Sequence, residues 1–485
     1  MATIPDQAQH AVIAVNRFGL GARPRDLVKA AKDPQLWLKN QMFSPQLNSQ
    51  LADTKTAFEQ FSAHRKIRGQ QKKSAKMQVQ SMMLEQPTAD QSMSMQIMKS
   101  NKSIASGQTR YAKLMRQTQK NLLIDSLWQS VETTEPFSMR LLDFFSNHFS
   151  VSSSTALLKV VAPLLEREAI APHLFGHFED MLIAVMKHPA MLMYLDNARS
   201  TGPNSRAGRY NKKRGINENL AREIFELHTL GVDGGYHIGD IQELAKALTG
   251  WSVSYPADQL QEGFIFREKL HEPGTRIILA KRYRHEGQRQ VEAILKALAR
   301  HPSTAKFLSY KLACHFISDQ PDPDLVSAMA TRWQDSKGNL SAVMTTLIEH
   351  PSSWQLQRQK FKTPREFVVS TLRSVGLEQK SARGFLTGLV YHLTEMGQAP
   401  FSAGSPAGYS TYAKDWSGSD ALIKRIDWVN RLVTVSPKLS FSALDLAKQL
   451  FADDVSERTL KVLAGAETAR QAYTMLFMSP EFQRR

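Results

Sequence analysis

Apolar residues recur at helical spacing along most of this 485-residue chain, and this period constrains the fold more than any other feature. Within residues 140–148 they form the wide apolar stripe of a buried helix. The same spacing recurs in three further segments, 174–187, 304–317 and 363–375. Pro364 falls in the first turn of the last segment and Gly376 just past its end, as expected for a helix start and stop. No alternation of strands and helices is visible, which argues against a doubly wound sheet.

Strand signals are confined to one short part of the chain. Apolar residues spaced two apart occur at 264–266 and 277–279, and the turn-forming sequence His-Glu-Pro-Gly lies between them at 271–274. The sequence therefore predicts a mostly α fold with a small β-hairpin near residues 264–280. We expect one large multi-helix globular domain over residues 9–485.

Positive charge is concentrated in residues 61–120. This segment holds 12 of the 62 Lys and Arg residues and only Glu85 and Asp90 as acids, so 12 − 2 = +10 of the net +17 lies here. Gln, Ser and Met dominate the remainder, with few aliphatic or aromatic side chains to bury. Residues 68–108 are therefore expected to form a mobile or loosely helical Met/Gln/Lys-rich insertion in the helical body.

Three interpretations of this basic insertion stay open. The first is a solvated arm without a ligand, the second is an arm that binds an acidic protein or another polyanion, and the third is a methionine-lined Cu(I) site. A protein partner or an anionic surface is favoured over nucleic acid. Only Phe61 and Tyr111 lie near enough to stack on bases, and no recognition-helix motif accompanies the charge.

Residues 217–231 carry the densest polar chemistry. Asn217 can cap a helix here and Gly231 can end it. At 3.6 residues per turn, a carboxamide, a guanidinium and two carboxylates share one arc, namely Asn219, Arg222, Glu223 and Glu226. That face is either solvated, with Arg222 offsetting the repulsion between the acids, or buried, where the acids share a proton or a metal ion.

Further turn-forming and helix-end residues are candidates for the same site. We expect eleven residues to converge on one polar pocket: the candidate catalytic residues Glu223, Glu226, His148, His228 and His271, and the candidate binding residues Asn147, Asp196, Asn197, Asn204, Asn219 and Arg222. Glu223 and Glu226 would be the acid/base pair or oxygen ligands of a divalent metal, Arg222 would hold an anionic group, and a histidine would relay protons. Nothing in the residues selects a metal, a reaction or a substrate.

Several classes of protein are disfavoured by what the sequence lacks. It has no phosphate-binding loop, nucleophile elbow, His-Glu-x-x-His zinc motif or cysteine cluster, and its only cysteine, Cys314, allows no internal disulfide. No run approaches 18 apolar residues, so no membrane span is expected. Residues 1–17 lack the pattern of a signal peptide, so the chain as written is expected to be cytoplasmic.

A set of short motifs resembles a large bacterial family known as domain of unknown function 1800. These motifs are residues 16–24, 145–152, 188–197, 217–231, 240–251, 271–274, 301–305, 362–367, 397–401 and 479–485. The resemblance implies a predominantly helical fold and no established activity. Many members resemble exported proteins, so a periplasmic location is the alternative to a cytoplasmic one.

Two classes of function therefore stay open. One is an enzyme, hydrolase-like or metal-dependent, that uses the polar pocket. The other is a non-catalytic binding or scaffold protein that uses its basic insertion to hold an acidic partner or polyanion.

Overall fold

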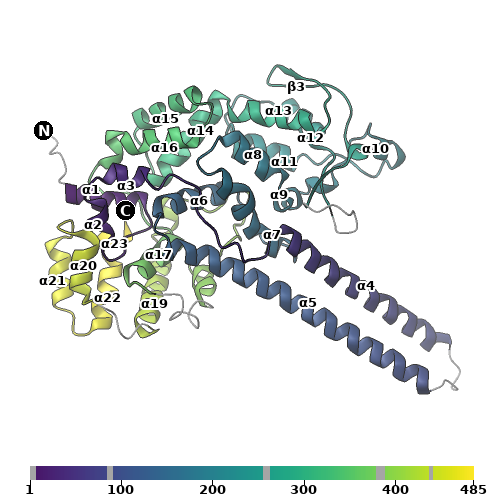
Figure 1. Ribbon diagram of the computed structural model, residues 1–485, viewed down its shortest axis with the longest axis horizontal. Helices are drawn as coiled ribbons and strands as arrows, with labels where there is room; N and C mark the ends of the chain where they lie inside the picture. The colour runs from purple at the N-terminus through teal and green to yellow at the C-terminus, as the bar shows by residue number, and fades with distance from the viewer. Residues whose placement is uncertain (1–6, 85–90, 255–262, 378–387, 436–440) are drawn as a thin grey trace.

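The computed structural model describes residues 7–84, 91–254, 263–377, 388–435 and 441–485, and most of them are helical (Figure 1). The α-helices of the first half are α1 (Gln7–Ile13), α2 (Asp26–Ala30), α3 (Pro34–Lys39), α4 (Thr54–Leu84), α5 (Gln91–Glu132), α6 (Pro136–His148), α7 (Leu158–Leu165), α8 (Phe178–Lys187), α9 (Pro189–Tyr194), α10 (Arg206–Tyr210), α11 (Asn219–Glu223) and α12 (Ile238–Leu248). Those of the second half are α13 (Gln288–Ala299), α14 (Pro302–Phe316), α15 (Pro323–Asp335), α16 (Leu340–Glu349), α17 (Pro364–Ser374), α19 (Ser419–Val435), α20 (Ala443–Phe451), α21 (Glu457–Ala464), α22 (Ala469–Met478) and α23 (Pro480–Gln483).

Short helical segments of other pitch join these helices. The π-helical segments are η1 (Ala14–Phe18), η2 (Glu166–Ile170) and η5 (Ile224–His228). The 3₁₀ segments are η3 (Ala171–His173), η4 (Asn197–Arg199), η7 (Glu268–Leu270), η8 (Pro351–Trp354) and η9 (Ala413–Asp415). The mostly α class expected from the apolar spacing is thus confirmed.

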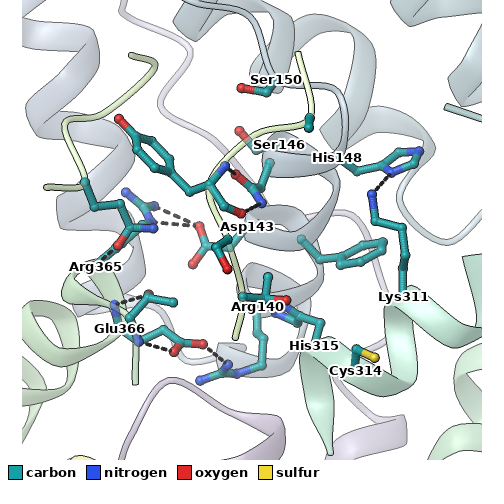
Figure 2. Close-up of a pocket in the computed structure, with 18 of the residues that line it drawn as sticks. Arg140, Asp143, Ser146, His148, Ser150, Lys311, Cys314, His315, Arg365 and Glu366 are labelled. Carbon is teal, nitrogen blue, oxygen red and sulfur yellow. Dashed lines mark hydrogen bonds and ion pairs between the residues drawn. The ribbon is translucent and has the colours of Figure 1, made fainter. Parts of the chain in front are cut away.

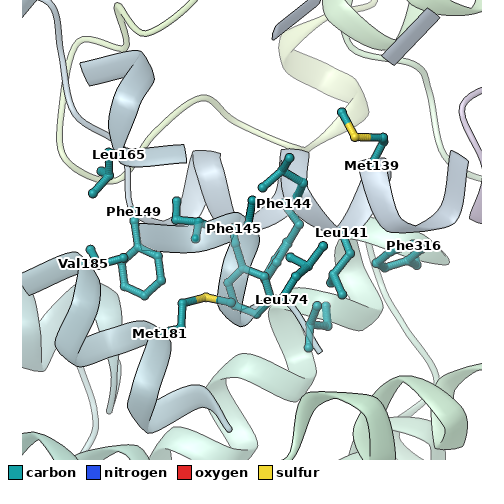
Figure 3. Packing of buried hydrophobic residues seen from close by; sticks show 14 of the residues in the cluster. Met139, Leu141, Phe144, Phe145, Phe149, Leu165, Leu174, Met181, Val185 and Phe316 are labelled. Carbon is teal, nitrogen blue, oxygen red and sulfur yellow. The ribbon is translucent and has the colours of Figure 1, made fainter. Parts of the chain in front are cut away.

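Helix α6 lies near the centre of the body, where segments from the whole chain meet (Figure 1). Its Phe145 packs against Phe149 and Phe178, with ring centroids 6.4 and 6.3 Å away, and all three rings are fully buried (Figure 3). Aromatic pairs at this spacing add about 0.5–1.5 kcal/mol to the gain from burial alone. A Phe145→Ala substitution would leave a cavity at the centre of the core and cost about 3–5 kcal/mol.

Helix α17 begins and ends as its sequence predicts. Pro364 occupies the first turn, and the Thr363 and Glu366 side chains cap each other's backbone N–H in a capping box. Gly376 follows the helix with a φ of +63°, a conformation that costs glycine little. The start of this helix is therefore fixed locally, which places Arg365 and Glu366 for the contacts described below.

Helices α4 and α5 form a long antiparallel pair that projects away from the body (Figure 1). Gln60 and Thr118 face each other across the pair, with 3.2 Å between Oε1 and Oγ1. At its base, Thr54 N–H and Oγ1–H donate to the Glu168 carboxylate at 2.8 and 2.6 Å. Within the expected insertion of residues 68–108, the described segments 68–84 and 91–108 continue these two helices.

Two separate two-stranded antiparallel sheets replace the single hairpin expected near residues 264–280. The strands are β1 (Trp251–Val253), β2 (Phe264–Phe266), β3 (Arg276–Ile278) and β4 (Lys281–Tyr283). β2 pairs with β1 in the register Trp251↔Phe266, and β3 pairs with β4 in the register Arg276↔Tyr283. The expected pairing of 264–266 with 277–279 was therefore wrong, although strands occur near both positions.

The turn between β3 and β4 explains this error. Leu279 and Ala280 both have positive φ, 49° and 60°, as a tight two-residue hairpin turn requires. Neither residue type is typical of such a turn. The Asp240 carboxylate accepts a hydrogen bond from Leu279 N–H at 2.7 Å, and this contact from α12 supports a conformation that the local sequence does not favour.

Candidate active site

A cavity of about 270 Å³ lies between α6, the first turn of α17, one side of α14 and the loop 398–412 (Figure 2). Its lining is rich in charged and titratable side chains: Arg140, Asp143, His148, Glu166, Lys311, Cys314, His315, Lys360, Arg365, Glu366 and Arg485. Polar groups that converge on a concave surface are the usual mark of a binding or catalytic site.

Helix α6 supplies one wall of the cavity. Every residue of this helix is buried except Asp143, Ser146 and Asn147. These three lie at positions i, i+3 and i+4, so they form one stripe along the helix. Arg140 and His148 of the same helix are buried and also line the cavity, so α6 contributes to both the core and the cavity.

The floor of the cavity holds a buried carboxylate between two arginines. Glu366 Oε1 accepts from Arg140 Nη1 at 2.6 Å and from Arg485 Nη2 at 2.7 Å, and all three side chains are nearly inaccessible. Burial alone would raise the pKa of the Glu366 carboxyl. The charges of Arg485 and Arg140 outweigh burial and hold this pKa well below its usual value. This triad is charged at neutral pH, and its surplus is one positive charge.

A second ion pair also joins α17 to α6. Arg365 Nε and Nη2 lie 3.0 and 2.9 Å from Asp143 Oδ1 (Figure 2). Glu166, the first residue of η2, is buried nearby and accepts from Ser126 Oγ at 3.0 Å. Burial raises the pKa of the Glu166 carboxyl, the charge of Arg365 opposes this, and the charge of Asp143 adds to it. Asp143 is thus a paired carboxylate, and Glu166 is a carboxyl that binds protons more readily.

Lys311 on α14 lies on the wall of the cavity with its Nζ 3.0 Å from His148 Nδ1 (Figure 2). Within the described residues, no carboxylate oxygen lies within 4 Å of this Nζ. The Nζ atoms of Lys187, Lys246 and Lys360, by contrast, each have a carboxylate oxygen within that distance. Burial lowers the pKa of Lys311 to about 8. Lys311 is therefore a cavity lysine whose charge is not compensated by an acid.

His148 is buried and neutral. Its Nε2 lies 3.3 Å from the carbonyl oxygen of His228, to which it donates, so Nδ1 is left as the acceptor that faces Lys311. Burial, then the charge of Lys311, lowers the pKa of His148 well below its usual value. The side chain of His228 packs behind it, with ring centroids 5.7 Å apart, and burial lowers the pKa of His228 to about 3.

Asn147 shapes the cavity rather than contributing reactive chemistry. Its Nδ2 donates to Tyr409 O at 2.8 Å, and its Oδ1 accepts from Tyr409 N–H at 2.8 Å. The neighbouring Gly408 has a φ of +81°, and a Cβ there would lie 2.4 Å from Asn147 O. This clamp holds the loop 398–412 against α6, and it needs both the carboxamide and the glycine.

The structure does not bring the eleven expected residues into one pocket. Asn147 and His148 line the cavity, and His228 lies directly behind His148. The other eight do not line it.

Four of these eight lie on one half-exposed face. The expected helix over 217–231 is present as α11 followed by η5, with Asn217 Oδ1 accepting from Asn219 N–H at 2.8 Å. Arg222 bridges Glu218 and Glu226 at 3.7 and 3.3 Å, while Asn219 is exposed. Burial, then the charge of Glu226, raises the pKa of Glu223. Arg222 thus pairs with the acids one turn before and one turn after it on a half-buried face.

The other four stabilise turns elsewhere. Asn197 Nδ2 donates to Leu248 O and Trp251 O at 3.2 and 3.0 Å, and the exposed Asp196 has a positive φ. Asn204 Nδ2 donates to Glu272 Oε1 at 2.6 Å. His271 is buried and its Nδ1 lies 2.9 Å from Thr249 O, to which it donates. Asn197 and His271 thus satisfy backbone carbonyl groups around β1, whereas Asn204 binds the Glu272 carboxylate.

The described residues contain neither a cluster of metal-binding side chains nor a helix able to span a membrane. No three His, Cys, Asp or Glu side chains there are grouped as metal ligands would be. Within the same ranges, no helix is both long enough and apolar enough to cross a membrane.

The comparison with known families decides what this chain is related to. It matches the model of the family described as Protein of unknown function (DUF1800) over residues 13–484. The chain belongs to the DUF1800 family. No curated protein and no solved structure matches this DUF1800 chain. Its cavity must therefore be interpreted from its own geometry.

Proposed function

We propose that this DUF1800 protein is an enzyme whose active site is the cavity beside α6, with Lys311 as the reactive group and His148 as its proton partner. One observation carries the proposal. Lys311 Nζ lies on the cavity wall within hydrogen-bond reach of a neutral imidazole nitrogen, and no acid of the described chain neutralises it. Lysines in such surroundings serve as general bases or as nucleophiles.

The pKa of about 8 makes this role effective at neutral pH. At pH 7 about a tenth of a group with this pKa is the free amine, against about four in ten thousand for an ordinary lysine. His148 Nδ1 accepts the hydrogen bond and orients the amine. Glu166, whose carboxyl binds protons readily, and the ion-paired Asp143 supply an acid and a fixed negative charge on the opposite wall. This donor set suits proton-transfer chemistry on a small polar substrate.

Competitive acylation of the native protein tests the proposal. Limiting acetic anhydride at pH 7.5, followed by peptide mass spectrometry, reports how fast each lysine reacts. Lys306, an exposed lysine on the same helix, is the internal control. We expect Lys311 to be acetylated at least about tenfold faster than Lys306, since the free-amine fraction sets the rate. Equal rates, or slower acetylation of Lys311, would remove the basis for this active site.

A second function, binding of an acidic partner, is favoured by the helical hairpin. Ten of the twelve Lys and Arg side chains of residues 61–120 are described, and all ten are exposed. Residues 61–84 and 91–120 contain no Asp or Glu. A projecting, uniformly positive pair of helices would attract an acidic protein and lose that attraction as salt increases.

Shortening the hairpin tests this second function. Because Gln60 faces Thr118, removal of residues 68–108 with a short Gly-Ser link shortens both helices by similar amounts. This removes six cations and two acids, a net change of 6 − 2 = 4 positive charges. We expect the shortened protein to lose acidic partners that the full chain retains at low salt. Retention of the same partners would exclude the hairpin as the binding element.

A further inference from the structure

Two buried polar atoms of cavity-lining residues lack partners in the described part of the chain. Among the described residues, the buried atoms Arg485 Nε and His315 Nε2 have no hydrogen-bond partner, and both residues line the cavity. A buried guanidinium N–H without an acceptor is unfavourable, and a bound molecule with acceptor atoms would relieve that cost. Arg485 also shares its carboxylate with Arg140, so this side of the cavity is positive.

Lys311 lines the same cavity, and its neighbours leave its amine free to react. The groups near it are His148 from α6, His228 from η5, Cys314 on its own helix, and the ring of Phe307 at 5.3 Å. None of these is a carboxylate that would hold the amine as an ammonium ion. Of the nucleophiles that line the cavity, Cys314 is the weaker choice, because burial raises the pKa of its thiol.

We infer that Lys311 forms a covalent imine with a small aldehyde or ketone that carries a carboxylate or phosphate group. This inference rests on the proposed function and names its substrate class. The carbonyl carbon would be attacked by Lys311 Nζ, and the anionic group would be held by the positive side of the cavity around Arg485 and Arg140. His148 acts as a positioning residue that accepts and returns the proton of the amine.

The step balances without an oxidant or reductant. The lone pair of Lys311 Nζ forms a bond to the carbonyl carbon, and the carbonyl π pair moves to oxygen. One proton passes from nitrogen to that oxygen through His148 Nδ1, which gives a carbinolamine. This hydroxyl takes a second proton from solvent and leaves as water, while the nitrogen lone pair forms the C=N bond of a protonated imine. The products are the imine and one water molecule.

Borohydride trapping on the native full-length protein tests the inference with two probes of similar size. Glyoxylate is a carboxylate-bearing aldehyde, and glycolaldehyde is its neutral counterpart. Each probe is added with sodium cyanoborohydride at pH 7.5, and the modified lysines are located by peptide mass spectrometry. We expect glyoxylate to modify Lys311 about a hundredfold faster than the exposed Lys306, because imine formation follows the free-amine fraction. Glyoxylate should also modify Lys311 at least about tenfold faster than glycolaldehyde does, since only glyoxylate pairs with the positive side.

Each outcome decides between specific claims. Preferential trapping of glyoxylate on Lys311 supports the imine and its anionic substrate class, while equal trapping of both probes overturns the anionic class. If Lys311 is acylated faster than Lys306 but traps neither probe, the imine is wrong and the proposed active site stands. If Lys311 is ordinary in both experiments, both proposals fail. A K311R variant, which keeps the charge and cannot form the imine, should show no adduct at position 311.

Discussion

The cavity and the helical hairpin differ in how their positive charges are stabilised. In the cavity the cations are buried or partly buried, and Arg140, Arg365, Lys360 and Arg485 each contact a carboxylate, whereas Lys311 does not. On the α4–α5 hairpin every described cation is exposed, and residues 61–84 and 91–120, which carry all of these cations except Lys55, contain no acidic residue. Water solvates the hairpin charges, so they need no partner, but a buried charge without one is expensive. An unpaired cation is therefore unremarkable on the hairpin and a mark of function in the cavity.

The largest effect is expected from the carboxylate shared by two arginines. E366Q should lower the free energy of unfolding by about 3–5 kcal/mol, because Arg140 and Arg485 lose their buried counterion. Urea denaturation at pH 7 measures this. The matched control is E349Q, whose exposed pair with Lys39 should be worth less than about 1 kcal/mol. Equal losses of stability in the two variants would show that burial does not determine how much these ion pairs contribute to the free energy of unfolding.

The same variant predicts a pH dependence. The pKa of Glu366 is lower in the folded state than its usual value of 4.5, so its stabilising contribution is complete above that value. The contribution is lost as the pH falls toward the folded-state pKa. The difference between the native protein and E366Q should therefore be constant above about pH 5.5 and shrink in more acidic solution, because the unfolded carboxyl is then largely protonated. A difference that grows with acidity would contradict the assignment.

An effect of intermediate size is expected from two lysines of the cavity, whose substitutions should change the free energy of unfolding differently. Lys360 contacts Asp319 and is 1% exposed, so K360M should lower the free energy of unfolding by about 2 kcal/mol. K311M should leave it unchanged or raise it by up to about 1 kcal/mol, since it removes a buried charge without breaking an ion pair. Thermal unfolding of both variants checks this. A K311M variant as unstable as K360M would mean that Lys311 is a structural residue.

The smallest effect is expected on the hairpin. Replacement of the exposed Lys72, Lys73 and Lys76 with Gln should change stability by less than about 0.5 kcal/mol. The salt concentration that elutes the protein from a heparin column should nevertheless fall.

A matched control for this experiment lies on the body. Lys212, Lys213 and Arg214 are consecutive and exposed. Their replacement with Gln removes three positive charges, the same number as the hairpin substitutions. We expect it to lower the elution salt less than the hairpin substitutions do. The opposite order would place the main anion-binding surface on the body and not on the hairpin.

Local chemistry made much of the fold predictable. The caps of α17 and the apolar stripe of α6 are encoded within a dozen residues, and both appear as expected. The β3–β4 turn was not predictable, because Leu279 depends on Asp240 from a distant helix. The helix over 217–231 was found, but its polar face pairs its charges within itself and remains half exposed.

The candidate site was only partly predictable for a similar reason. Asn147 and His148 were recognised as helix-end residues, and the polar stripe of Asp143, Ser146 and Asn147 on an apolar helix was a further signal in the sequence. Lys311 carries no such signal. Its importance depends on a contact with His148, 163 residues away, and on the absence of a nearby acid in the described structure. Only the tertiary fold determines both.

The protonation of Lys311 in the intact protein is the most direct test of the account. Nuclear magnetic resonance of protein labelled with ¹³C at lysine Cε, with the signal assigned from its loss in K311R, follows this one amine across pH. The account predicts a titration midpoint near pH 8, because the partly buried Lys311 lies beside a neutral histidine without a counterion. A midpoint at or above 10.4, the usual value for lysine, would show that the amine is an ordinary solvated cation and would contradict the account.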